Sequence, residues 1–309
     1  MRHLISTSVA VALIFALCAG CGSPPASSTP ARLIAAQSVA PLLPVAAMTA
    51  ASPDEYEVEL GADPDFLRAQ LASGSADVAV LPTEAAAALY NGGLDIVMLG
   101  ALDLSLLHVV GPANSSLDGL SEIAVAFPGD TADHVSQAVF EAQGLSIEFS
   151  YETTMPDVLA GLASGASNAA VLPEHFASLA VAQSSGSLAV IADLRDEWEA
   201  ATKTAATPQI AIVASTEYFD SHRDTVDSIS SLLEDSFGDD QIDGGTLAEL
   251  AALADVDRDL ASAATARLDA VYLSDAEARD ATSAYLAALI DLNSDIAGGR
   301  LPDDGFYAS

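Results

Sequence analysis

The chain has 309 residues, 51% of them apolar, which is enough for the cores of one large or two ordinary domains. Its 44 acidic and 10 basic residues give a net charge of −34 and no basic footprint, so we expect no nucleic-acid partner. The acidic residues are dispersed along the chain, as is typical of a solvated surface. After the first twenty residues no apolar run reaches about eighteen residues, so no membrane-spanning helix is predicted.

The first twenty residues have the pattern of an export signal. Arg2 precedes an apolar run from Val9 to Leu17, which is too short to span a bilayer. The sequence “LCAGC” then resembles the lipobox of bacterial lipoproteins, although Cys18 stands where the usual leucine is found. The resemblance implies that Cys21 is acylated and becomes the mature N-terminus, which would anchor the protein to the cell membrane on its outer side. An ordinary secretory signal is the alternative.

A Ser/Pro/Ala stretch, “GSPPASSTPA”, follows Cys21 and is suited to a flexible tether. We therefore predict a signal peptide over 1–20 and a lipid-anchored tether over 21–31. Both cysteines of the sequence fall in these segments. The mature domain is thus predicted to have no disulfide and no thiol chemistry.

From Arg32 onward, short apolar runs alternate with amphipathic stretches, which indicates strands alternating with helices and a mainly parallel sheet. The expected strands are 32–36, 56–60, 77–81, 95–101, 106–111, 122–127, 147–152, 168–172, 188–193 and 209–215. Helices are expected between them, for example over 64–73, where Asp63 is the predicted cap and Gly74 the terminator. Thr83 is the predicted cap of the following helix.

One segment occurs twice. “LASGSADVAVLPTEAA” at 71–86 and “LASGASNAAVLPEHFA” at 162–177 are identical at nine of sixteen positions. Each contains helix end, Gly turn, strand, Leu-Pro and helix start in the same order. The segment does not recur a third time, as a solenoid would require. It therefore indicates the same strand-to-helix corner in each of two similar α/β lobes.

The segment after Gln209 has one expected strand followed by four expected helices, which is not the pattern of a third lobe. We expect it to return and cover the first lobe, with chain crossings near 112–121 and 200–209. The predicted fold is therefore a two-lobed α/β fold with a ligand cleft between the lobes. Lobe one is expected to comprise 32–114 and 206–309, and lobe two 115–205.

In open parallel sheets, ligands bind beyond the carboxyl ends of the strands, where loops lead into helix N-termini. Unpaired N–H groups there can hold an anionic or polar ligand without lysine or arginine. The candidate ligand-binding residues in these loops are Ser38 and Thr83 in lobe one, and Gly129, Asp130, Thr131, Glu174 and His175 in lobe two. Plain helix capping is an alternative explanation for Thr83, Asp130 and Thr131.

His134 and His175 lie near the expected cleft and could be ligand donors, or could form a metal pair with Glu174. Metal binding is not predicted, because a zinc site needs three or four well-spaced ligands and the chain has no HExxH motif and no cysteine cluster. Histidines on the surface or beside the ligand site are the favoured interpretation. The segment 239–250 comes close to a calcium loop but has Leu250 where the bidentate glutamate is needed. The sequence also contains no GxSxG, no P-loop and no GxGxxG after a strand, so no cofactor is expected.

The two remaining histidines of the mature chain have simpler assignments. His108 is on an apolar strand and is predicted to be a core residue. His222 opens a helix and is predicted to be exposed. Neither is expected to bind a ligand.

Four segments carry a resemblance to a known family: “GSADVAVLPTEAAAALYNGG” at 74–93, “AAVLPEHFA” at 169–177, “TPQIAIVASTEYFDSHRDTVDSI” at 207–229 and the terminal “GGRLPDDGFYAS”. They resemble the solute-binding lipoproteins of ABC importers with the type II periplasmic-binding fold, in the nitrate, sulfonate and thiamine-precursor branch. The Pro-Glu-x-Phe that follows a second-lobe strand in that branch matches Pro173, Glu174 and Phe176. The resemblance spans nearly all of the mature chain and implies two lobes joined by crossing strands, with a small solute clamped between them.

The resemblance implies a solute-binding component that delivers a small organic solute to an ABC permease and its ATPase, closing by a hinge motion. Basic and aromatic side chains, which binders of sulfonates or nitrate often use, are not prominent in these loops, so a neutral or cationic solute fits better. Two alternatives remain. One is an enzyme on the same scaffold, as in menaquinone biosynthesis, although the loops show no paired acid and base. The other is a solute-sensing lipoprotein without a transport role.

Overall fold

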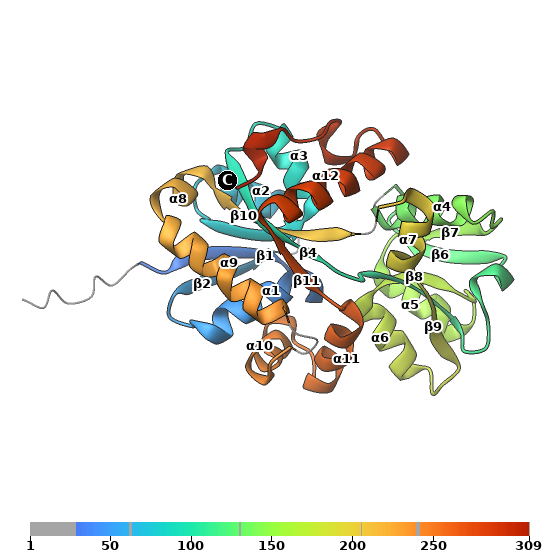
Figure 1. Cartoon of the computed structure of the whole chain (residues 1–309). Helices are drawn as coiled ribbons and strands as arrows, with labels where there is room; N and C mark the ends of the chain where they lie inside the picture. The colour runs from blue at the N-terminus through green and yellow to red at the C-terminus, as the bar shows by residue number, and fades with distance from the viewer. Residues whose placement is uncertain (1–28, 62–63, 130, 205, 239–241, 309) are drawn as a thin grey trace, which may run out of the picture.

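The computed structural model of the chain describes residues 29–61, 64–129, 131–204, 206–238 and 242–308. The predicted signal peptide, Cys21, most of the tether, Asp63, Asp130 and the start of the calcium-like segment lie outside the described residues. Within them the chain forms two β-sheets with flanking helices, one at the left and one at the right of Figure 1.

The first sheet has six strands in the order β11-β4-β10-β3-β1-β2. Their bounds are β1 Ala31–Ala36, β2 Tyr56–Gly61, β3 Val78–Pro82, β4 Ile96–Asp103, β10 Pro208–Ser215 and β11 Val271–Ser274. The second sheet has five strands in the order β7-β6-β8-β5-β9. Their bounds are β5 Leu107–Pro112, β6 Glu122–Ala126, β7 Glu148–Glu152, β8 Ala170–Pro173 and β9 Leu188–Asp193.

Most strands of each sheet run in one direction. β1 pairs in parallel with β2 and β3, and β6 pairs in parallel with β7 and β8. The strands that run against their neighbours are β5, β10 and the edge strand β11, and the first two follow directly on a passage between the sheets. The predicted two-lobed α/β fold with mainly parallel sheets is confirmed.

The chain passes between the sheets twice. The first passage is at 104–106, because β5 pairs with β8 and β9 of the second sheet. We expected it near 112–121, where the turn residues of “GPANSSLDGL” are concentrated. Those residues connect β5 to β6 within the second sheet, since turn signals mark a reversal of the chain and not the sheet that a strand joins. The second passage is at 203–207, between α7 and β10.

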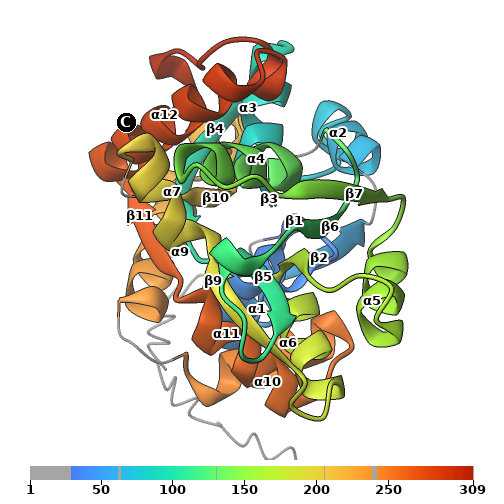
Figure 2. The same cartoon turned by 90° about the vertical axis from the view of Figure 1, so that its right-hand side faces the viewer.

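Helices cover both faces of each sheet (Figures 1 and 2). Their bounds are α1 Val39–Ala51, α2 Pro64–Ala72, α3 Thr83–Asn91, α4 Thr131–Ala142, α5 Met155–Ser164, α6 Glu174–Gln183, α7 Leu194–Thr202, α8 Thr216–Ser221, α9 Arg223–Phe237, α10 Gly244–Ala254, α11 Arg258–Leu268 and α12 Asp275–Leu292. In the first lobe, α1, α9 and α10 pack on one face and α2, α3 and α12 on the other. In the second lobe, α4 and α7 lie opposite α5 and α6. Three short 3-10 turns complete the described elements, at Leu117–Gly119, Ile296–Gly298 and Asp304–Phe306.

The last long helix, α12, joins the two cores. Its Leu286 packs with Ala87 of α3, whereas Tyr285 and Leu289 belong to the core of the second sheet. There the Tyr285 ring meets the Trp198 ring of α7 edge-on, with the centroids 5.9 Å apart. The C-terminal region therefore packs against both lobes, and not against the first alone.

Three elements differ from the sequence prediction, and the first is the short helix α8, Thr216–Ser221, which was not expected between β10 and the helix predicted to begin at Ser221. The strand β11 was expected to be helical, but “VYLS” pairs with β4 at the edge of the first sheet. The helix α7, “LRDEWEAAT”, was not predicted, although Leu194, Trp198 and Ala201 have the i, i+4, i+7 spacing of an amphipathic helix. It forms because the Asp193 side chain caps it by accepting the N–H of Arg195, and because Leu194 and Trp198 are buried. None of the described helices is both long and apolar enough to cross a membrane.

Candidate functional site

The doubled segment forms matching corners in the two sheets. Pro82 ends β3 opposite Ile210, and Pro173 ends β8 opposite Leu107. Both prolines have extended backbone, with ψ of 138° and 149°, and both stand immediately before a helix. The repeated strand-to-helix corner predicted from the sequence is thus confirmed.

The predicted capping role of Thr83 is wrong. Because strand pairing holds Pro82 in an extended conformation, Pro82 becomes the cap residue and Thr83 the first residue of α3. The Thr83 side chain makes no capping hydrogen bond. It is 0% exposed, and its hydroxyl oxygen has no hydrogen-bond partner among the described residues.

The start of α4 lies at the end of β6. Gly129 has φ of +86°, which favours glycine, and its N–H donates to Oδ2 of Asp133 at 2.8 Å. Asp133 is 3% exposed, and its Oδ1 accepts hydrogen bonds from Gln137 at 2.6 Å and from the Tyr151 hydroxyl at 3.0 Å. The chain's own carboxylate therefore satisfies the glycine N–H at this helix start.

The helix starts of the two lobes meet at one hydrogen bond. The hydroxyl of Thr131, the first residue of α4, donates to Oε1 of Glu84, the second residue of α3, at 2.8 Å. The structure thus brings the Thr131 corner of lobe two against the Thr83–Glu84 corner of lobe one. Glu84 follows Thr83 directly after the shared Leu-Pro, where the two copies of the doubled segment diverge and where the sequence predicts that ligand choice resides.

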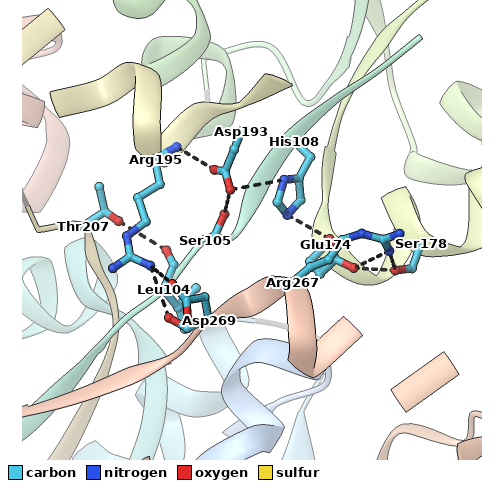
Figure 3. A network of polar contacts seen from close by, with 10 residues as sticks. All are labelled: Leu104, Ser105, His108, Glu174, Ser178, Asp193, Arg195, Thr207, Arg267 and Asp269. Atoms are coloured by element: carbon cyan, nitrogen blue, oxygen red, sulfur yellow. Dashed lines mark hydrogen bonds and ion pairs between the residues drawn. The ribbon is translucent and has the colours of Figure 1, made fainter. Parts of the chain in front are cut away.

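Glu174, the first residue of α6, is the equivalent of Thr83 in the doubled segment but faces a buried polar network (Figure 3). It is 1% exposed, and its Oε2 lies 2.8 Å from Nε2 of His108 as an ion-pair contact without hydrogen-bond alignment. Its Oε1 accepts a hydrogen bond from Ser178 and contacts Nη1 of Arg267 on α11 at 3.4 Å. His108 is buried, as predicted, but it packs between charges as well as in the core.

The network continues to the two passages between the sheets (Figure 3). His108 Nδ1 lies 3.8 Å from Oδ2 of Asp193, which also accepts the hydroxyl of Ser105. Arg195 donates to Asp103 at 2.9 Å and contacts Asp269 at 3.4 Å. A polar cavity of about 370 Å³ adjoins this network. It is lined by six residues: Ser105, Asp193, Arg195, Asp196, Glu199 and Asp269.

Asp103, at the end of β4 and directly before the first passage, is held from the second passage and from α7. Its Oδ1 accepts hydrogen bonds from the N–H of Thr207 at 2.7 Å and from the Thr207 hydroxyl at 3.1 Å. Thr207 belongs to the second passage. Arg195, on α7 of lobe two, binds the other carboxylate oxygen of Asp103. The two connections between the lobes are therefore tied to each other.

The remaining predicted residues make separate contacts. His175 is partly buried, with its ring centroid 3.9 Å from that of Phe176, and burial lowers the pKa of His175 to about 4 despite the opposing charge of Glu174. The ring is therefore neutral at pH 7. Ser38 precedes α1 and makes no side-chain cap bond. His134 Nε2 lies 2.9 Å from the side-chain nitrogen of Asn293. His222 is exposed, as predicted.

The sequence contains no metal-binding motif around His134, His175 and Glu174. Within the described ranges, no three His, Cys, Asp or Glu side chains are grouped in a way that could hold a metal ion. Glu174 instead contacts His108 and Arg267.

No protein-family model and no curated protein matches the sequence. Solved structures do match the fold. A crystal structure of an ABC transporter from Parabacteroides distasonis superposes with a TM-score of 0.73 and 24% identity, over 91% of this chain and 99% of that chain. The periplasmic aliphatic sulphonate binding protein SsuA from Escherichia coli gives a TM-score of 0.66 and 16% identity, over 90% and 93% of the two chains.

A third match comes from a eukaryote. The product of a conserved Candida albicans gene, described as having the generic periplasmic binding protein fold, gives a TM-score of 0.54 and 16% identity over 89% of this chain and 98% of that chain. All three similarities extend over nearly the whole described chain. The chain therefore has the two-lobed periplasmic-binding-protein fold.

Proposed function

We propose that the chain is the extracytoplasmic solute-binding component of an ABC transporter, and that it captures a small organic solute between its lobes and delivers it to a permease. The observation that carries this proposal is the structural similarity over 91% of this chain and 99% of an ABC transporter structure. The hydrogen bond between Thr131 and Glu84 supports it, because it joins two helix starts that follow strands of different sheets. Open α/β sheets bind ligands at such positions.

In this proposal lobe two begins with β5 and extends to residue 205, and lobe one consists of the rest of the chain from residue 32. The proposed ligand contacts are Ser38, Thr83, Gly129, Thr131 and His175, together with Asp130, which lies outside the described residues. Glu174, engaged by His108, Ser178 and Arg267, would act by holding the α6 corner in place. Solute contacts to both lobes would favour the closed state by differential affinity.

We further propose that acylated Cys21 anchors the protein to the outer side of the cell membrane and that the segment before Arg32 serves as a tether. The “LCAGC” sequence and the Ser/Pro/Ala stretch support this part of the proposal.

A thermal-shift panel of small organic solutes tests the function. A solute present at about a hundred times its dissociation constant stabilises the folded state by about 2.7 kcal/mol, which raises the melting temperature by several degrees. We expect Thr131→Phe and Thr83→Val to weaken the shift. Thr216→Phe is the matched control, because Thr216 is also the first residue of a helix that follows a strand, α8. If a solute is found and both site variants bind it as the unchanged protein does, the site assignment is contradicted.

A further inference from the structure

The helix starts that meet between the lobes already hold carboxylates of the chain itself. Glu84 is in the first turn of α3 and Asp133 is in the first turn of α4. The Gly129 N–H donates to Asp133 at 2.8 Å, and the Thr131 hydroxyl donates to Glu84 at 2.8 Å. Two hydrogen-bond donors at the start of α4 are therefore bonded to acids of the chain.

A negatively charged ligand group would meet unfavourable electrostatics at this place. A helix N-terminus attracts anions through its free N–H groups and partial positive charge. A first-turn carboxylate supplies that negative charge already, and a second anion a few ångströms away would be repelled by it. The net charge of −34 makes the surface negative on average, which disfavours an anionic ligand further.

An independent observation at the same corner points to a ligand. The Thr83 hydroxyl oxygen is fully buried beside Glu84 and lacks a hydrogen-bond partner in the described part of the chain. Buried hydroxyl groups are nearly always hydrogen-bonded, since leaving one unpaired is costly. A ligand atom that donates or accepts a hydrogen bond would satisfy this hydroxyl group, so the observation indicates a ligand and the neighbouring carboxylates indicate its charge.

We propose that the captured solute carries a protonated amine or another cationic nitrogen group, which binds between the starts of α3 and α4 with Glu84 as counter-ion and the Thr83 hydroxyl as an acceptor. The inference rests on the proposed solute-binding function and specifies the charge of the solute. It separates this chain from the structurally similar Escherichia coli protein, which binds aliphatic sulphonates.

Matched probes test the charge preference. The purified full-length protein in detergent is titrated at constant ionic strength with alkylammonium chlorides and with sodium alkanesulfonates of equal chain length, and its melting temperature is recorded. We expect the ammonium series to raise the melting temperature and the sulfonate series to leave it unchanged. Glu84→Gln is expected to weaken the apparent affinity for the ammonium probes at least tenfold. Glu217→Gln is the control. Like Glu84 in α3, Glu217 is the second residue of a helix that directly follows a strand, here α8, but it is exposed.

Three results would overturn the inference: stabilisation by the sulfonates, no stabilisation by the ammonium probes, or an unchanged ammonium response in Glu84→Gln. Native mass spectrometry of the same protein distinguishes a failure of the charge assignment from a failure of the proposed solute-binding function. A bound anionic solute would contradict the charge assignment and leave solute binding intact. A protein that binds no solute of either charge would contradict the proposed function itself.

Discussion

Arg195 on α7 donates a hydrogen bond to Asp103 at the end of β4 over 2.9 Å, so a cation of the second lobe is paired with an acid at the first passage between the lobes. The two side chains are 20% and 10% exposed, which leaves the pair only partly screened by water. Thr207 of the second passage binds the other oxygen of the same carboxylate. One acid thus fixes the geometry of both connections.

We expect Arg195→Gln to lower the free energy of unfolding by about 1–2 kcal/mol, because Asp103 would lose its charged partner while remaining largely buried. Urea unfolding of the full chain measures this change. Arg279→Gln is the matched control: its partner Asp280 is 74% exposed, so a change within about 0.5 kcal/mol is expected. Equal effects of the two substitutions would argue against a structural role for the Arg195 pair.

The pKa of His175 gives a pH dependence with a definite sign. Burial lowers this pKa from 6.5 to about 4, so the unfolded chain binds a proton at a higher pH than the folded chain does. Above pH 6.5 the ring is neutral in both states, and the free energy of unfolding is highest. As the pH falls from 6.5 toward 4, the unfolded chain is protonated first, which lowers the free energy of unfolding by up to about 3 kcal/mol. We expect His175→Gln to reduce the slope of stability against pH in that window, measured by urea unfolding at several pH values. A slope that stays the same in the variant would refute the assignment to His175.

The single tryptophan offers a direct readout of the packing between the lobes. Trp198 of α7 is 1% exposed and contacts Tyr285 of α12, which connects to the first lobe. Removing the ring by Tyr285→Ala would leave a cavity, cost about 3–5 kcal/mol and admit water to Trp198. We expect its fluorescence emission to move to longer wavelength, and Tyr285→Phe to preserve it. An unshifted emission in Tyr285→Ala would show that Trp198 is not packed on α12.

The lipid anchor is tested at Cys21. We expect Cys21→Ser to move the protein from the membrane fraction to the soluble extracytoplasmic fraction and to remove a mass corresponding to the acyl chains. Cys18→Ser is the control and should remain in the membrane fraction. If Cys21→Ser stays membrane-bound and Cys18→Ser does not, the lipobox has been assigned to the wrong cysteine.

Much of the fold could be predicted from local sequence signals. The corners at Pro82 and Pro173 were predictable because the strands before them are apolar and the prolines cannot continue a ladder. The sheet that β5 joins was not predictable, since an apolar strand fits either sheet equally well. The short strand β11 was likewise missed, because four residues carry too little periodicity to distinguish a strand from a helix.

The site was predictable only in part. Thr83 and Thr131 were identified by their positions after strands, and the structure brings their two corners together through Glu84. The network of Asp103, Arg195 and Arg267 was not predicted, because its residues are far apart in the chain and meet only once both passages are in place. Pairing across such distances leaves no local pattern in the sequence.

Native mass spectrometry of the protein purified without denaturation tests solute binding most directly. The proposed function predicts an additional mass of one small organic molecule, which is lost on unfolding and whose retention is weakened by Thr131→Phe but not by Thr216→Phe. A protein that carries no such molecule and binds none from a broad panel of small solutes would contradict the account.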